Sequence, residues 1–215
     1  TKPVPNQDEM NLPWPVAIER LENSPTYPDK FCAAFGDSKI TMDRVTKAIA
    51  QFERTFISFN SKYDRVRRGV DSYTAMEAGG ARLFNNERGD CFHCHQAPLF
   101  TTSTFHNTGL DSVVVDRGRY DVTGNPADLG KFKAPSLRNC ADRFVFEHDS
   151  RFSLREAVEH YNNFHDGLDV DPLIRVRRSR APMTEAEIDS IVEFLGALSD
   201  PDFITNPNLA TPYAP

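Results

Sequence analysis

The residues with the clearest chemistry form one short run, Cys91-Phe92-His93-Cys94-His95. Two cysteines separated by two residues can each form a thioether with a vinyl group of one porphyrin, and the histidine that follows can bind the iron. Zinc would need a second ligand pair at similar spacing, and the two remaining cysteines are not arranged in that way. The run therefore predicts covalent attachment of haem c through Cys91, Cys94 and His95, with His93 facing solvent.

The composition is that of an ordinary globular protein, because 39% of the 215 residues are hydrophobic and 26% are charged. No uninterrupted apolar stretch has the length of a membrane span, and the first residues lack the apolar core of a signal peptide. We therefore expect a processed or truncated chain with no membrane span. Since haem is attached to such motifs outside the bacterial cytoplasm, we expect a periplasmic location.

The net charge of -6 argues against nucleic acid as a partner, because no basic surface is available to displace counterions from phosphates. The four arginines between residues 175 and 180 form a short cluster, which we expect to lie in a solvated loop. Cys32 and Cys140 could pair in an oxidising compartment. A small buried thiol is the commoner state of such cysteines, so we favour free thiols.

Apolar residues recur at helical spacing in five segments, which predict helices over residues 16–23, 41–59, 72–86, 154–162 and 184–198. Thr41 and Thr184 are N-cap candidates, and the aromatic residues of the second helix are expected in the core. The rest of residues 1–30 should form an extended arm. The segment from 96 to 152 should be irregular, and the tail after Pro201 should be extended.

The helix over 72–86 leads straight into the haem motif, and Gly79 precedes Leu83 and Phe84 in it. This arrangement resembles the first helix of class I cytochromes c, in which a glycine lets the C-terminal helix cross closely. The helix over 184–198 is the expected partner. A long irregular segment is acceptable here because a haem offers it apolar surface. We predict a mainly α fold: a class I cytochrome c-like helical haem domain with long loops, preceded by part of a second helical domain.

Further motifs follow one another along the chain in a fixed order. They are Ala48-x-x-x-Phe52-Glu53-Arg54-Thr55, Gly80-x-x-Leu83-Phe84, the haem run, Pro98-Leu99-Phe100-Thr101, Phe105-His106-Asn107-Thr108-Gly109, Phe132-Lys133-Ala134-Pro135-Ser136-Leu137-Arg138-Asn139 and Met183-Thr184-x-x-Glu187. Together they resemble the bacterial dihaem cytochrome c peroxidases and MauG over nearly the whole chain. The resemblance implies a mainly helical scaffold with two c-type haems, one in each domain.

Only one haem-attachment motif is present in this sequence. The resemblance therefore implies that residues 1–70 are the end of an N-terminal haem domain and residues 71–215 are a C-terminal cytochrome c-like haem domain. The first haem would belong to an upstream half or to a separate partner chain. In this reading the haem at His95 stores and transfers electrons for a peroxide-reacting haem elsewhere. Its partners would be a donor cytochrome or cupredoxin, or a protein substrate.

The run Asn6-Gln7-Asp8-Glu9-Met10 is similar to the family's Asn-Pro-x-Glu-Met, with glutamine in place of proline. The family's glutamate serves as the acid/base that helps to split peroxide, so the resemblance implies a catalytic role for Glu9. An exposed acid in a loose terminus is the alternative. For the chain as a whole, the alternative function is a monohaem c-type electron carrier without catalysis.

The sixth ligand of the iron decides whether this haem can react with peroxide or only transfers electrons. A thioether just before the C-terminal helix is typical of class I cytochromes c, which favours Met183. The family pattern favours Tyr161, where related peroxidases have methionine and MauG has tyrosine. We expect Tyr161, with Met183 as the second choice. The remaining candidates, in falling order, are His160, His165 and His148.

Two further expectations concern the haem propionates and a calcium ion. Lys133 and Arg138 are candidates to neutralise the haem propionates, since a guanidinium can bind a carboxylate with two hydrogen bonds. The resemblance also implies a calcium ion bound by backbone carbonyls near Arg143 and Val145, although the usual Thr-x-Pro is absent here.

Overall fold

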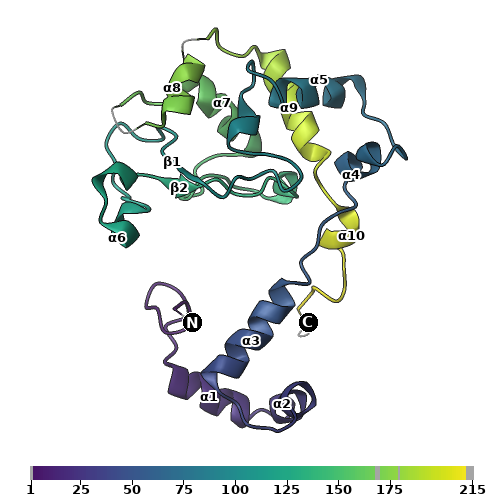
Figure 1. Ribbon diagram of the computed structural model, residues 1–215, viewed down its shortest axis with the longest axis vertical. Coiled ribbons are helices and arrows are strands. Elements are labelled where there is room, and N and C mark those ends of the chain that lie inside the picture. The colour runs from purple at the N-terminus through teal and green to yellow at the C-terminus, as the bar shows by residue number, and fades with distance from the viewer. Residues whose placement is uncertain (1, 168–169, 179, 212–215) are drawn as a thin grey trace. The chain divides into compact units, whose positions relative to one another are not determined.

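The computed structural model describes residues 2–167, 170–178 and 180–211, and the chain forms two compact units, Thr1–Ile57 and Ser58–Pro215 (Figure 1). We call them unit 1 and unit 2. Their boundary lies upstream of the one expected after residue 70. The physical reason is that the first residues of unit 2 are bonded within that unit: the Asp200 carboxylate accepts the backbone N–H groups of Phe59 and Asn60, each at 2.9 Å.

The helices of unit 1 are α1 (Trp14–Glu22), α2 (Tyr27–Phe35) and α3 (Met42–Glu53). Thr41 caps α3 as predicted, since its hydroxyl accepts the Arg44 N–H at 3.2 Å. The expectation of an extended arm missed α2. A proline is tolerated in the first turn of that helix, and Gly36 ends it with a φ of 86°.

The apolar face of α3 is exposed, so the expectation that its aromatic residues lie in the core is wrong for the described chain. No residue of α3 is buried, and 46% of Ile49 and 45% of Phe52 are exposed. The helix also ends at Glu53, which leaves Phe56 outside it. The buried hydrophobic residues of unit 1 are Ala17, Phe31 and Ile40.

Unit 2 is mainly helical, as predicted. Its helices are α4 (Lys62–Arg67), α5 (Ala75–Phe84), α6 (Tyr120–Thr123), α7 (Leu154–Asn163), α8 (Pro172–Arg178), α9 (Glu185–Gly196) and α10 (Pro201–Ile204). Thr184 caps α9 in a reciprocal capping box with Glu187, and Thr74 and Glu77 form another at the start of α5. The helices α4, α6, α8 and α10 were not expected from the sequence.

The segment between α5 and α7 is largely irregular, as predicted. It contains an antiparallel sheet of β1 (Phe105–His106) and β2 (Phe132–Lys133), in which Phe105 lies opposite Lys133 and His106 opposite Phe132. Three single turns of 3-10 helix also lie between α5 and α7: η1 (Cys91–His93), η2 (Pro126–Asp128) and η3 (Cys140–Asp142).

The hydrophobic core of unit 2 lies where α5 crosses α9 (Figure 1). The rings of Phe84 and Phe194 pack there with their centroids 5.2 Å apart. Gly80 makes the crossing possible, because a Cβ on it would lie 1.8 Å from the Ser190 carbonyl oxygen. A Cβ on Gly79 would lie 3.7 Å from the Ser190 hydroxyl oxygen. The close crossing was thus predicted correctly, but the residue that permits it is the neighbouring glycine.

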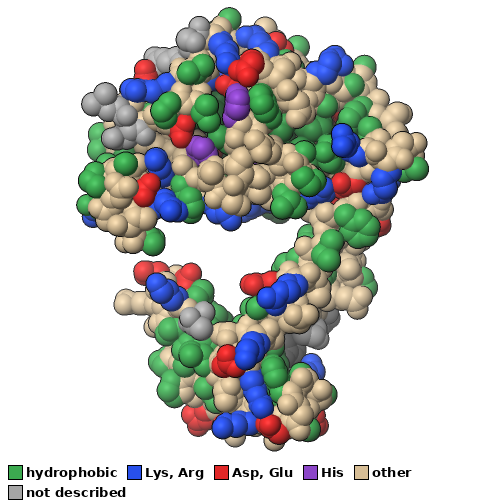
Figure 2. Space-filling model, viewed as in Figure 1, with side chains coloured by type: hydrophobic (Ala, Val, Ile, Leu, Met, Phe, Trp, Pro, Cys, Tyr) green, Lys and Arg blue, Asp and Glu red, His purple; other side chains and the backbone are tan. Residues whose placement is uncertain are grey.

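Acidic and basic side chains are mixed over the face of the molecule that Figure 2 shows, in keeping with the net charge of -6. The arginine cluster lies partly on α8 rather than in the expected solvated loop. Arg175 pairs with Asp166 at 3.2 Å, whereas Arg177 is buried. In the described ranges no helix combines the length and the apolar character that crossing a membrane would require.

Candidate haem-binding site

The Cys91–His95 run leaves α5 and folds into η1. The His95 N–H donates to the Cys91 carbonyl oxygen at 2.9 Å, which brings the two ends of the run together. Gly89 permits the close entry into this turn, because a Cβ on it would lie 2.3 Å from the Leu83 carbonyl oxygen. Both thiols and the imidazole therefore lie along one wall of the same cavity.

The His95 imidazole is held through one nitrogen. Its Nδ1 lies 3.0 Å from the Phe100 carbonyl oxygen and 3.1 Å from the Pro135 carbonyl oxygen. Because both partners are acceptors, Nδ1 carries the hydrogen, and Nε2 forms no hydrogen bond with any described residue. Burial lowers the pKa of His95, so the ring is neutral at neutral pH. This tautomer, with a second-sphere acceptor on Nδ1, is the form in which histidine binds a metal through Nε2.

The cavity has a volume of about 430 Å³, within the range of cofactor sites in proteins. Apolar side chains of α7, α8 and α9 line it, among them Val158, Ile174, Ile191 and Leu195. Burial raises the pKa of Cys91 to about 12 and that of Cys94 to about 11. Because a redox dithiol reacts as a thiolate, these raised pKa values argue against a redox-dithiol role for the pair.

Tyr161 and Met183 line the same cavity as His95. The Tyr161 hydroxyl has no hydrogen-bond partner among the described residues, and burial raises its pKa far above the usual value. Met183 is buried in the core cluster of unit 2. Asn162 fixes its backbone, with the Asn162 amide donating to the Met183 carbonyl and accepting its N–H, each at 2.9 Å. The tyrosine thus lines the cavity and has a hydroxyl that no described residue uses, whereas the methionine is already part of the packing.

The side chains of three other histidines have partners in the protein. His106 binds Asp171 through Nδ1 at 2.7 Å and Thr104 through Nε2 at 2.7 Å. His160 is buried, and its Nε2 binds the Thr108 carbonyl at 3.0 Å. The ring of His148 stacks on Phe132 with centroids 3.7 Å apart. Of the candidate histidine ligands, His148 lines the cavity and His160 and His165 do not.

Arg177 is the feature of the site that sequence reasoning missed. It lines the cavity with 3% of its surface exposed, and its Nε atom is buried without a hydrogen-bond partner among the described residues. Its one hydrogen bond that the structure shows runs from Nη2 to the Asn162 side-chain oxygen at 3.1 Å. Burial lowers its pKa, but an arginine stays protonated. A buried guanidinium with an unused donor fits a cofactor that carries carboxylates, as haem does.

A signal for Arg177 was present in the sequence. Ile174 and Arg177 are three residues apart, so on a helix they share one face. Ile174 is buried at this cavity, and Arg177 follows it there. Reading 172–178 as a helix would have placed this arginine beside an apolar residue rather than in solvent.

The two predicted propionate partners differ in position. Lys133 lines the cavity as expected. Arg138 is not among the residues that line it, and both of its terminal nitrogens donate to the Asp64 carboxylate at 2.8 Å. Its Nε donates to the Pro98 carbonyl oxygen at 2.8 Å. These bonds use three of the five N–H donors of the guanidinium, and the role of Arg138 beside a propionate stays a prediction.

The remaining predicted site residues lie elsewhere. Glu9 belongs to unit 1, where it is exposed in a turn closed by its N–H and the Asn6 carbonyl oxygen at 3.2 Å. Arg143 and Val145, near the implied calcium position, line the cavity of unit 2. Cys32 is an exposed free thiol and Cys140 a buried one.

The fold and the cavity together define a mainly helical domain of the c-type haem class. Known proteins agree with this. A family profile described as di-haem cytochrome c peroxidase matches residues 1–72. The cytochrome c551 peroxidase of Nitrosomonas europaea is 32% identical over 209 residues, and the match spans 94% of this chain and 58% of that protein. MauG of Methylorubrum extorquens is 34% identical over 212 residues, spanning 96% of this chain and 59% of MauG.

A solved structure is also similar. A MauG-like protein associated with microbial copper homeostasis superposes with a TM-score of 0.86 at 28% identity, covering 99% of this chain and 71% of that one. The chain belongs to the bacterial dihaem cytochrome c peroxidase and MauG family, as its motifs predicted. It spans 58% and 59% of the length of the two curated relatives described above.

Proposed function

We propose that this chain is the haem c-binding part of a peroxide-dependent dihaem oxidoreductase, and that Cys91, Cys94 and His95 attach its haem. The observation that carries the proposal is the cavity that both thiols and the unbonded Nε2 of His95 share. When bound, the haem supplies a redox-active iron that stores and passes electrons. The chain's own task is to orient the imidazole, exclude water and balance charge.

We assign the opposite side of the iron to Tyr161, with Met183 as the second choice. The support is the Tyr161 hydroxyl, which faces the cavity without a partner among the described residues. An anionic phenolate favours ferric over ferrous iron, whereas a thioether does the reverse. A haem closed on both sides is suited to electron storage. Peroxide would then react at the second haem, outside this chain.

The haem carboxylates would be neutralised by Arg177 and Lys133. Arg177 contributes a buried donor that no described residue uses, and Lys133 contributes an ammonium group at the same cavity. A buried cation without a partner is costly. An anionic group on the bound haem would remove that cost.

Unit 1 corresponds in this proposal to the end of the N-terminal haem domain, and unit 2 to the C-terminal haem domain. The match of residues 1–72 to the family profile supports the first assignment. The exposed apolar face of α3 supports it as well, because such a face needs a covering partner. We expect the upstream half, or a separate chain, to cover it and to carry the second haem. Glu9 would then be enclosed and could move a proton during peroxide cleavage.

The electron source and final substrate follow from the family rather than from this site. A donor cytochrome or cupredoxin would serve a peroxidase, and a protein substrate would serve a MauG-like enzyme. Haem c attachment supports a periplasmic location. The calcium ion near Arg143 and Val145 remains a prediction, which elemental analysis of the purified protein would test.

The decisive experiment measures haem content. We expect the intact mass of this chain to include one covalent haem, and the pyridine haemochrome spectrum of the complete complex to give two. Absence of covalent haem from Cys91 and Cys94 would overturn the site. One haem in the complete complex would instead support the monohaem electron carrier. Tyr161→Phe should change the coordination state of the ferric haem, and an unchanged spectrum would transfer the ligand role to Met183.

A further inference from the structure

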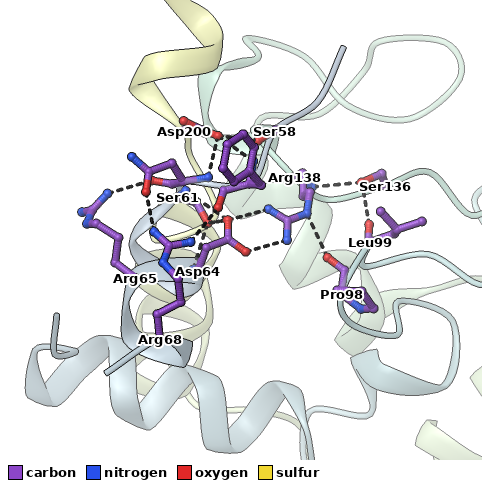
Figure 3. A network of polar contacts seen from close by, with 12 residues as sticks. Ser58, Ser61, Asp64, Arg65, Arg68, Pro98, Leu99, Ser136, Arg138 and Asp200 are labelled. Carbon is purple, nitrogen blue, oxygen red and sulfur yellow. Dashed lines mark hydrogen bonds and ion pairs between the residues drawn. The ribbon is translucent and has the colours of Figure 1, made fainter. Parts of the chain in front are cut away.

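The short segment 98–100, just after the haem motif, is held by its three carbonyl groups. The Arg138 Nε donates to the first of them at 2.8 Å, and the Ser136 hydroxyl donates to the second at 2.6 Å. The third, that of Phe100, accepts the His95 Nδ1 hydrogen at 3.0 Å. The segment that orients the candidate iron ligand is thus fixed in turn by Ser136 and Arg138 (Figure 3).

Arg138 is itself fixed by Asp64. Both terminal nitrogens of its guanidinium bind the Asp64 carboxylate, each at 2.8 Å, and both side chains are largely buried. Burial alone would raise the pKa of Asp64, but the bonds from Arg138 and Ser61 outweigh it and hold that pKa below its usual value. The pair therefore stays ionised at neutral pH. Because a guanidinium is planar and rigid, its two hydrogen bonds to Asp64 determine the position from which Nε donates to the Pro98 carbonyl.

Asp64 does not move freely either. Its carboxylate accepts the Ser61 hydroxyl at 2.7 Å and the Ser61 N–H at 3.0 Å, which closes the cap of α4. Asp200 is buried and binds the adjoining segment through the Ser58 hydroxyl at 3.1 Å. A polar network therefore leads from the first residues of unit 2 to the Pro98 carbonyl (Figure 3). The Phe100 carbonyl, two residues further along the chain, binds the imidazole of His95.

We propose that Asp64 and Arg138 are positioning residues for the haem iron: through the Pro98 carbonyl they set how tightly the Phe100 carbonyl holds the His95 N–H. The inference rests on the proposed function, since it requires His95 to bind the iron. A carbonyl that holds the Nδ1 hydrogen tightly gives the imidazole more anionic character, which makes it a stronger donor and favours ferric iron. Loosening the segment should therefore raise the reduction potential.

The variants must separate position from charge, because removing one buried charge would by itself shift the potential. Arg138→Lys keeps the positive charge but loses the bidentate hydrogen bonding to Asp64. The double variant of Asp64→Asn with Arg138→Gln removes the pair without changing the net charge. Both should shift the midpoint potential of the haem in the full chain to more positive values. The hyperfine-shifted NMR signal of the His95 ring N–H should also exchange faster with solvent.

Arg68→Gln is the matched control. Arg68 binds the Phe59 carbonyl at 3.0 Å and the Asn60 side-chain oxygen at 2.5 Å, so it belongs to the same network but forms no bond with segment 98–100. Its removal should leave the potential unchanged. If Arg138→Lys and the double variant lower the unfolding temperature but leave the potential and the NMR signal unchanged, the proposal is overturned and the pair is only structural.

A milder variant covers the case in which the Arg138 variants do not fold. Ser136→Ala removes the bond to the second carbonyl and the bond that the Ser136 hydroxyl accepts from the Arg138 N–H at 3.3 Å, and it should give a smaller positive shift. If that shift is absent, the proposal is likewise overturned. The proposed function fails differently: wild-type protein would then carry no covalent haem, and no potential could be measured for any variant.

Discussion

Unit 1 and unit 2 use their apolar residues in opposite ways. In unit 2 the rings of Phe84, Phe100 and Phe194 are fully enclosed where α5 crosses α9. In unit 1 the helix with the clearest apolar stripe, α3, buries none of its residues. A strongly amphipathic helix with an uncovered apolar face needs another surface for its stability. Unit 2 therefore encloses its own apolar side chains, whereas the apolar face of α3 in unit 1 needs a partner surface.

The same contrast holds for charge. The carboxylates of Asp64 and Asp200 in unit 2 are buried, and each accepts several hydrogen bonds. In unit 1 the ion pair of Lys47 and Asp43 is mostly exposed, and such pairs contribute little. Order in unit 2 thus depends on buried polar groups whose hydrogen bonds are satisfied within the protein.

Removing the haem should give the largest effect and confine it to unit 2. Without the haem, the apolar side chains that line the cavity of about 430 Å³ would lose their packing partner and meet water, which should destabilise the helices around it. We expect haem-free protein with Cys91→Ala and Cys94→Ala to lose protection from hydrogen exchange in α7 and α8. Exchange in α1 to α3 should not change. Equal changes in both units would contradict the contrast.

Truncating one apolar residue in each unit compares them directly. Ile188→Ala in unit 2 should reduce the free energy of unfolding by about 4 kcal/mol, because this side chain is 1% exposed and packed in the core. Ile49→Ala on α3 should change it by no more than about 0.5 kcal/mol, because the residue is exposed. Urea titration of the haem-loaded chain measures both. A large loss for Ile49 would mean that the α3 face is already covered.

If an upstream half covers the face of α3, as proposed, Ile49→Ala should weaken its binding even though it spares stability. Sedimentation or pull-down with that half, carrying its own haem, measures the effect. If the truncation leaves binding unchanged, the face of α3 is not the surface that the upstream half covers.

Two glycine substitutions test which of the adjacent residues Gly79 and Gly80 permits the close crossing of α5 and α9. Gly80→Ala should destabilise unit 2 by about 2 kcal/mol, because its Cβ would lie 1.8 Å from the Ser190 carbonyl oxygen. Gly79→Ala is the control and should be neutral or stabilising by about 0.5 kcal/mol, since alanine is the better helix former and its Cβ would have room. Thermal unfolding of both variants measures the difference. Equal losses would show that the two helices cross at another register.

Local signals in the sequence predicted the parts of the structure that depend on neighbouring residues. Thr184 and Glu187 form a capping box three residues apart, so the start of α9 could be read from the sequence. The haem-attachment run Cys91–His95 can be recognised from the spacing of its residues alone. The sequence could not show whether Gly79 or Gly80 meets α9, because that depends on how α5 is rotated about its axis.

Pairings over a long sequence separation could not be predicted. Asp64 and Arg138 are 74 residues apart, and the bidentate geometry of a guanidinium was the reason for assigning Arg138 to a haem propionate. Arg177 was missed because a run of charges was taken for a solvated loop, although its spacing from Ile174 fits one helix face. In both cases the sequence shows which residue types are present, and only the packing shows which charge meets which partner.

The smallest effect concerns pH and the start of α9. Arg88 binds the Glu187 carboxylate at 2.6 Å, and this bond is the main reason why the pKa of Glu187 falls to about 2 from its usual 4.5. Because the folded state holds the carboxylate in its charged form, the unfolded state binds more protons between these two values. The stabilisation is therefore complete above about pH 4.5 and is lost as the pH falls towards 2.

Glu187→Gln should remove this part of the acid sensitivity of unit 2. We expect a loss of about 1 kcal/mol at pH 7, since the pair is partly exposed and screened by solvent, and a smaller difference from wild type at pH 3. Arg88 also donates to the Ala181 carbonyl at 2.6 Å and the Pro182 carbonyl at 2.9 Å, so the effect should stay at the start of α9. Urea titrations at both pH values measure it. An equal loss at both would assign the role of Glu187 to helix capping rather than to its charge.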